Sequence, residues 1–172
     1  MLDKVREIEM LYMQSQKRYD EMELHPKIMQ FYLKEQPVSD IEYHDVLDLM
    51  GFTFPADLAE FYHYKNGSGT LEVIVTSKER RYRILSLAAM IELKMYFQNK
   101  IEPSKSTSGY DRIEDPTWIA FAASEDGSFL LLDTQNQVIL EYQFGTQVCV
   151  TKVADSFTQL LTSTIEKLKE IV

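Results

Sequence analysis

Two short apolar runs separated by a compact polar turn dominate the middle of the chain. The first run is Trp118–Ala122 and the second is Phe129–Leu132. Residues 124–128 between them are turn formers, and Gly127 can take a positive φ without a Cβ clash. Because both runs are almost continuously apolar, we expect the pair to lie near the centre of a sheet that helices cover. The pattern predicts a buried β-hairpin with an acidic tip.

Four further apolar runs have the length of β-strands. They cover residues 71–76, 82–85, 138–142 and 147–150. A charged connection joins the first two runs, and a glycine-containing turn at 144–146 joins the last two, so each pair is typical of a hairpin. Together with the central hairpin, they predict an antiparallel meander of about six strands.

Elsewhere the apolar residues recur at the spacing of an amphipathic helix. Ser39 and Glu42 have the spacing of a capping box, and we expect Asp155 to cap the last helix. The predicted helices cover residues 2–24, 28–33, 40–50, 55–66, 87–97 and 156–171. The fold class that follows is α+β, with N-terminal helices, an antiparallel sheet of about six strands with one helix inserted, and a C-terminal helix packed on the sheet.

The chain of 172 residues is long enough to bury one sizeable core. We expect residues 1–37 to form an N-terminal helical extension and residues 38–172 to form the main domain. Between residues 99 and 115 the chain turns polar and contains Pro103 and Gly109. This segment is predicted to be the most mobile loop.

Acidic residues outnumber basic ones, 27 against 18, which gives a net charge of -9. Such a chain repels a phosphate backbone, so direct binding to nucleic acid is not expected. The acidic excess concentrates in a stretch without Lys or Arg, at Asp40, Glu42, Asp45, Asp48, Asp57 and Glu60. A basic cluster stands at Lys78, Arg80, Arg81 and Arg83. The acidic stretch fits a basic partner, and an ordinary solvated face is the alternative interpretation.

Cys149 is the single cysteine, which excludes an intrachain disulfide and a cysteine-based zinc site. It lies in a predicted strand, where we expect the thiol to be buried as a small apolar group. The sequence opens without an apolar leader and contains no run long enough to span a bilayer. These features favour a soluble, cytoplasmic protein that does not act at membranes.

One predicted helix carries residue types that bind metals. Asp57, Glu60 and His63 recur every three residues, and Glu60 with His63 has the spacing used in carboxylate-bridged di-metal sites. Such a site needs a second copy of the motif, which the sequence lacks. Cys149 would need a basic partner and partial exposure to act as a nucleophile. We therefore expect no catalytic residue, no metal and no cofactor.

Four stretches of the sequence, taken in order, carry a resemblance to a known family. They are FPADLAEFYHYKNGSG at 54–69, RILSLAAMIELK at 83–94, WIAFAASEDGSFLLLD at 118–133 and ADSFTQLLTSTI at 154–165. In this order they resemble the SUKH superfamily, in the branch named for a yeast cell-wall assembly regulator (Smi/Knr-like). The resemblance makes residues 38–172 a SUKH-like domain and does not extend to the N-terminal helices.

The resemblance implies binding rather than catalysis. Many bacterial members look like immunity proteins that neutralise a cognate toxin, often a nuclease, of polymorphic or contact-dependent systems. A non-enzymatic protein that binds a basic toxin domain is therefore the first hypothesis. A regulatory or scaffold protein that binds an endogenous partner is the alternative. The resemblance specifies neither the partner nor an oligomeric state.

The partner surface is predicted around the tip of the central hairpin. Acidic residues lie in its turn and in the loop before it, at Asp111, Glu114, Asp115, Glu125 and Asp126. A negative rim of this kind steers a basic partner and raises the association rate. Tyr110 is the neighbouring aromatic residue that can anchor an interface. Ordinary loop solubility is the alternative explanation of these charges.

Overall fold

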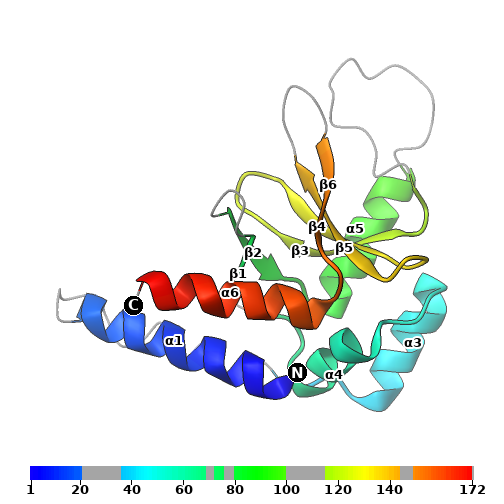
Figure 1. The fold of residues 1–172 in the computed structure, drawn as a ribbon. Helices are drawn as coiled ribbons and strands as arrows, with labels where there is room; N and C mark the ends of the chain where they lie inside the picture. Colours follow the sequence, from blue (N-terminus) through cyan, green and yellow to red (C-terminus); the bar gives the residue numbers. More distant parts are fainter. Residues whose placement is uncertain (21–35, 69–71, 76–79, 100–114, 144–148, 172) are drawn as a thin grey trace.

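The structure, a computed structural model, describes residues 1–20, 36–68, 72–75, 80–99, 115–143 and 149–171 (Figure 1). The helices in these residues are α1 (Leu2–Asp20), α3 (Asp40–Met50), α4 (Ala56–Tyr64), α5 (Leu87–Asn99) and α6 (Phe157–Ile171). The strands are β1 (Glu72–Val75), β2 (Arg80–Ile84), β3 (Trp118–Ala123), β4 (Phe129–Asp133), β5 (Val138–Gln143) and β6 (Cys149–Ala154). The predicted α+β class is confirmed. The predicted helix at 28–33 and most of the 99–115 loop lie outside the described residues.

The six strands form one antiparallel sheet in the order β1-β2-β3-β4-β5-β6, so each strand pairs with its neighbours in the sequence. The predicted meander is confirmed, and the β3–β4 hairpin lies at its centre. A β-bulge falls between Ala120 and Ala122 on β3. Bulges bend a strand and increase its twist. The extra residue, Phe121, is fully buried, and its ring lies 6.2 Å from that of Phe157 on α6.

Helices cover the two faces of this sheet unequally. The main core lies between one face and the helices α1, α4 and α6 (Figure 1). Within it, Phe61 of α4 meets Phe157 of α6 edge to face with ring centroids 5.4 Å apart. A smaller cluster occupies the other face, where α5 packs on β3 and its Phe97 contacts Phe129. The central strands are therefore apolar on both sides, as their continuous apolar runs predict.

The N-terminal helix α1 shares the main core. Val5, Ile8 and Leu11 are buried along one side of it, and α1 lies beside α6 (Figure 1). Glu9 accepts a hydrogen bond of 2.8 Å from the ammonium of Lys65, and the two side chains are only 10% and 5% exposed. The division of the chain at residue 37 stays a prediction, but the segments on either side of it pack together.

The helices α1 and α6 also close the edge strand β1. The N–H of Ile74 donates to the hydroxyl of Thr164 on α6 at 3.0 Å, and the carbonyl of Glu72 accepts from the hydroxyl of Tyr12 on α1 at 3.0 Å. Thr164 is fully buried. Because an open strand edge invites pairing with another strand, these two hydrogen bonds protect β1 from strand addition.

A short segment after α4 ties this helix to the junction between β2 and α5. The side-chain carbonyl of Asn66 accepts from the first N–H of α5 at 2.9 Å. Ser68 and Ile84 exchange two hydrogen bonds, of 2.7 and 2.9 Å. Gly67 between them has a φ of 91°, and a Cβ there would lie 3.0 Å from a backbone nitrogen of the junction. Both conformation and space therefore require glycine at this position.

The predicted N-terminal capping residue is confirmed for α3 but not for α6. The hydroxyl of Ser39 accepts from the N–H of Glu42 at 3.2 Å and caps α3 as predicted. At α6 the hydroxyl of Ser156 accepts from the N–H of Gln159 at 3.1 Å. The prediction that Asp155 caps α6 is therefore wrong by one residue. Asp155 instead donates its backbone N–H to the side chain of Gln159. Ser156 and Gln159 together satisfy the helix N-terminus in the manner of a capping box.

Cys149 opens the edge strand β6 and is exposed. The expectation that its thiol is buried is therefore wrong. An edge strand has a neighbour on one side only, so its apolar side chains gain less burial than those of a central strand.

In the described part of the chain, no helix has both the length and the apolar character needed to cross a membrane.

Candidate functional site

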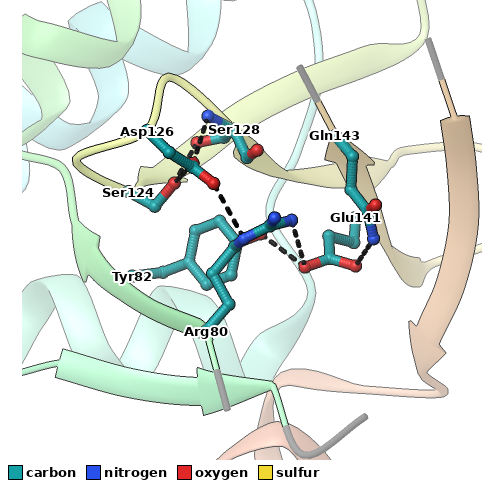
Figure 2. Close-up of polar contacts among 7 residues, drawn as sticks. All are labelled: Arg80, Tyr82, Ser124, Asp126, Ser128, Glu141 and Gln143. Atoms are coloured by element: carbon teal, nitrogen blue, oxygen red, sulfur yellow. Dashed lines mark hydrogen bonds and ion pairs between the residues drawn. The ribbon is translucent and has the colours of Figure 1, made fainter. Parts of the chain in front are cut away.

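A cluster of polar side chains lies where β2, the β3–β4 turn and β5 come together (Figure 2). Its central cation is Arg80 of β2, whose Nε lies 3.0 Å from the carboxylate of Asp126 in the turn. A guanidinium nitrogen of the same side chain lies 3.3 Å from Oε1 of Glu141 on β5. The arginine therefore links two carboxylates that come from different parts of the sheet.

Glu141 is the most deeply buried charged group of this cluster, with a side chain 1% exposed. Its Oε1 also accepts a 2.6 Å hydrogen bond from the hydroxyl of Tyr82, and its Oε2 accepts one of 2.5 Å from the amide of Gln143. Both carboxylate oxygens thus have partners. A buried carboxylate is tolerated under this condition, since an isolated charge in the interior is very costly.

The contact between Tyr82 and Glu141 joins strands that are not neighbours in the sheet. β3 and β4 lie between β2 and β5, and three strand spacings in a flat sheet amount to about 14 Å. The hydroxyl–carboxylate distance is only 2.6 Å. The sheet is therefore curled, and the long side chains of β2 and β5 meet across its concave side.

Asp126 organises the tip of the hairpin. Its carboxylate accepts from the hydroxyl of Ser124 and, at 3.0 Å, from the N–H of Ser128 (Figure 2). Partial burial alone would raise the pKa of Asp126, but these hydrogen bonds and the charge of Arg80 outweigh it and hold the pKa below its ordinary value. The Asp126 carboxylate is therefore negative at neutral pH, and its charge is balanced within the fold.

Tyr82 completes the cluster as a permanent donor. Burial is the main reason that the pKa of its phenol lies well above the ordinary value, and the hydrogen bond to Glu141 adds to the shift. The hydroxyl stays protonated throughout the physiological range. In this state it stabilises the negative carboxylate, and it offers no base for proton transfer. The arrangement serves to hold β2, the turn and β5 together.

A second charged group lies on the opposite, outer side of β2. Arg83 lies 3.1 Å from the carboxylate of Glu125 and 3.6 Å from that of Glu72, while Arg81 lies 3.5 Å from Glu72. The Glu125 side chain is 86% exposed. Exposed pairs of this kind contribute little stability, but they lower the net charge that the hairpin tip presents to a partner.

The predicted partner-binding residues fall into two groups. Tyr110, Asp111 and Glu114 lie outside the described residues. The other three are described and already have partners in the fold: Glu125 and Asp126 contact arginines of β2, and Asp115 accepts hydrogen bonds from the N–H and hydroxyl of Thr117 at 2.8 and 2.6 Å. Their role as a partner surface stays a prediction.

Two of the potential metal ligands on α4, Asp57 and His63, contact other side chains of the protein. The carboxylate of Asp57 accepts from the N–H and hydroxyl of Thr158 at the start of α6, at 2.8 and 3.0 Å. His63 lies 3.6 Å from the carboxylate of Asp40. Among the described residues, no three His, Cys, Asp or Glu side chains are placed to hold a metal ion.

Sequence reasoning missed the members of the cluster that come from β2 and β5. A signal for Glu141 was present, because it is a lone acidic residue inside the apolar run 138–142. A charged residue in a run that is otherwise buried needs a partner of opposite charge. The identity of that partner, Arg80, depends on the curl of the sheet, which local patterns do not describe.

Comparison with known families adds to this geometry. The family model for the SMI1/KNR4 family (SUKH-1) matches residues 37–163, which is most of the chain. The chain belongs to the SMI1/KNR4 family. The predicted SUKH resemblance is confirmed. No curated protein matches the sequence closely enough to add a relative with a known role.

The SUKH-1 match places the structural features of the site within the family domain. It extends from just before α3 into α6, and so includes the Asn66–Ser68 segment, the polar cluster and the central hairpin. The helix α1 lies outside the matched residues. SUKH-1 membership is consistent with a protein-binding module of the immunity type, which directs attention to the surfaces that the fold leaves exposed.

Proposed function

We propose that this chain is a cytoplasmic, non-enzymatic protein-binding module that acts as an immunity protein and neutralises a cognate toxin. The observation that carries the proposal is membership of the SUKH-1 family over residues 37–163. Neutralisation by binding needs a rigid scaffold with a complementary surface and no reactive group. The curled sheet with helices on both faces supplies such a scaffold.

The charge of the chain supports a basic partner. A net charge of -9 favours the approach of a positively charged protein and disfavours a nucleic acid. Toxin domains that cleave nucleic acid bind a phosphate backbone, which requires a basic active-site surface. A nuclease domain of a polymorphic or contact-dependent toxin system is therefore the first candidate. An acidic protein that covers this surface would compete with the substrate.

The interior of the polar cluster supports binding over catalysis. Arg80, Tyr82 and Glu141 are directed at one another (Figure 2). A cavity of about 20 Å³ lies between α1, α4, α6 and the sheet, beside Lys65 and Ser68, and has room for about one water molecule. Neither feature offers a substrate-sized space next to a reactive group.

The alternative, a regulatory scaffold that holds its partner through the N-terminal helices, receives less support. The apolar residues Val5, Ile8 and Leu11 of α1 are buried in the main core. They are therefore not available to a partner while the protein is folded. For this reason we keep the regulatory function as the second candidate.

Affinity purification from the native host tests the proposal. The tagged full-length chain should retain a basic protein with a toxin domain at low salt and less of it at moderate salt, because charge steering weakens as screening grows. Mass spectrometry identifies the retained protein. Recovery of a housekeeping protein at both salt concentrations would favour the regulatory alternative, and recovery of no protein at all would contradict both.

A further inference from the structure

The outer face of α3 carries the two most exposed large apolar side chains of the described residues. Ile41 is 77% exposed and Leu49 is 68% exposed, whereas Tyr43, Val46 and Met50 on the inner side are buried. At about 100° per residue, Ile41 and Leu49 lie about 80° apart around the helix axis and about 12 Å apart along it. They form one solvent-facing strip of α3.

Three carboxylates are interleaved with these apolar side chains. Glu42, Asp45 and Asp48 are exposed and lie with Ile41 and Leu49 within an arc of about 120°. In the parts of the chain that the structure describes, none of the three carboxylates has an ion-pair partner. We call these five residues the α3 face.

The α3 face differs in this respect from the acidic residues near the sheet. There, Glu72, Glu125 and Glu141 each contact an arginine of β2. The stretch that contains α3 has no Lys or Arg from residue 40 to residue 60. The ammonium of Lys94 on α5 contacts the backbone carbonyl of Met50 at the end of α3, but in the described residues it forms no ion pair with the carboxylates of the α3 face. Their negative charge is therefore unpaired within the part of the chain that the structure describes, where the apolar side chains are most exposed. α3 also lies at one end of the molecule, away from α1 and the C-terminus (Figure 1).

We propose that the α3 face is the docking surface for the basic protein partner, and this inference rests on the proposed function. Two apolar side chains surrounded by carboxylates complement a surface with an apolar contact area ringed by Lys and Arg. The apolar pair supplies the buried contact, and the charges supply orientation and a fast association. Nucleic acids and anionic membranes are excluded as occupants because they carry the same sign of charge. A second copy would bring two α3 faces with like charges together.

Two sets of substitutions separate the contributions of the apolar pair and the charges. The first variant carries Ile41→Ser and Leu49→Ser, and the second carries Glu42→Gln, Asp45→Asn and Asp48→Asn. A control variant carries Asp3→Asn, Glu166→Gln and Glu170→Gln, which removes the same amount of charge from exposed positions on other helices. All of these positions are exposed, so the variants are expected to fold, and thermal unfolding checks this.

The probe is the basic protein recovered by the full-length chain from the host, purified and titrated against each variant. We expect the apolar variant to weaken binding about 10-fold to 100-fold, mainly through faster dissociation. The charge variant should slow association about 10-fold and flatten its dependence on salt, while the control stays within about 3-fold of the wild type. Wild-type affinity in both α3 variants would overturn the α3 face as the docking surface.

The same titration distinguishes the failure of this inference from the failure of the proposed function. If the wild-type chain binds and neutralises the recovered protein while both α3 variants do so equally well, only the location is wrong. If no basic protein is retained by the wild type, the proposed function and the location both fail. Analytical ultracentrifugation of the free chain measures its oligomeric state. A wild-type dimer that dissociates on substitution of the α3 face would show that a second copy of the chain, not a basic partner, occupies this surface.

Discussion

Replacing Glu141 with alanine should lower the free energy of unfolding by about 3–5 kcal/mol, the usual cost of breaking a buried ion pair from one side. The substitution leaves the guanidinium of Arg80 and the hydroxyl of Tyr82 without the carboxylate that both contact. Because the Glu141 side chain is 1% exposed, its loss leaves buried polar groups without their acceptor, which costs more than the loss of an exposed contact. Equilibrium unfolding in urea, followed by far-UV circular dichroism, measures the change.

Glu125→Ala provides the matched control. It also removes one glutamate that contacts an arginine of β2, but its side chain is 86% exposed. The expected loss is below about 1 kcal/mol, because exposed ion pairs are screened by solvent. Equal losses in the two variants would show that the polar cluster does not hold β2 and β5 together.

The second large effect is expected at the contact between α1 and the segment after α4. Glu9→Ala removes the carboxylate that lies 2.8 Å from the ammonium of Lys65 and accepts a second hydrogen bond from Tyr64. Both members of the ion pair are nearly inaccessible to water, so we expect a loss of about 3 kcal/mol or more. The midpoint of urea denaturation should fall accordingly.

A double replacement separates the charge from the packing. In Glu9→Leu with Lys65→Met, two apolar side chains replace the pair, and stability is expected to return to within about 1–2 kcal/mol of the wild type. A double variant as unstable as Glu9→Ala would show that packing at this contact, not the charge on Lys65, sets the cost. In that case the buried ion pair is not what joins α1 to the domain.

These expected effects also bear on experiments with truncated chains. Removing residues 1–37 deletes α1 with its buried Val5, Ile8 and Leu11, and takes Glu9 away from Lys65. Such a deletion removes part of the core. A loss of partner binding in the truncated chain therefore reports on stability as well as on contact, and point substitutions on exposed surfaces are the sharper test.

Much of the fold follows from local patterns. The apolar runs at 118–133 predict the central hairpin, and Ser39 with Glu42 predicts the start of α3, because turn formers and capping residues act on their immediate neighbours. The same local reasoning places the cap of α6 one residue early. Asp155 and Ser156 are both good capping residues, and the choice between them depends on the position of Gln159.

The long-range polar contacts do not follow from such patterns. Arg80 and Glu141 are 61 residues apart, and Glu9 and Lys65 are 56 apart. Each pair forms because the curl of the sheet or the packing of α1 brings the partners together. The sequence also predicts a partner surface at the acidic hairpin tip, which stays a prediction; what the sequence did not indicate is that arginines of β2 contact Glu125 and Asp126. A count of charges along the chain does not show which of them are balanced across strands.

The acidic residues fall into those that have an ion-pair partner and those that have none within the described residues. Those near β2 contact its arginines: Glu141 does so in the interior, where it joins β2 to β5, and Glu125 does so at the surface, where the pair adds little stability. Glu42, Asp45 and Asp48 on α3 form no ion pair within the described residues, and they surround the exposed side chains of Ile41 and Leu49. The acidic stretch seen in the sequence therefore becomes the more specific candidate for a partner surface once the ion pairs of the hairpin are known.

The most direct measurement is a titration of the recovered basic toxin domain with the purified full-length chain, with the toxin's own activity as the readout. We expect activity to fall in proportion to the added chain and to vanish near one equivalent, and to return when the complex is separated at high salt with the toxin unchanged in mass. Full toxin activity in the presence of saturating chain would contradict the proposed immunity function. A lasting loss of activity with a change in toxin mass would contradict inhibition by binding and indicate an enzyme.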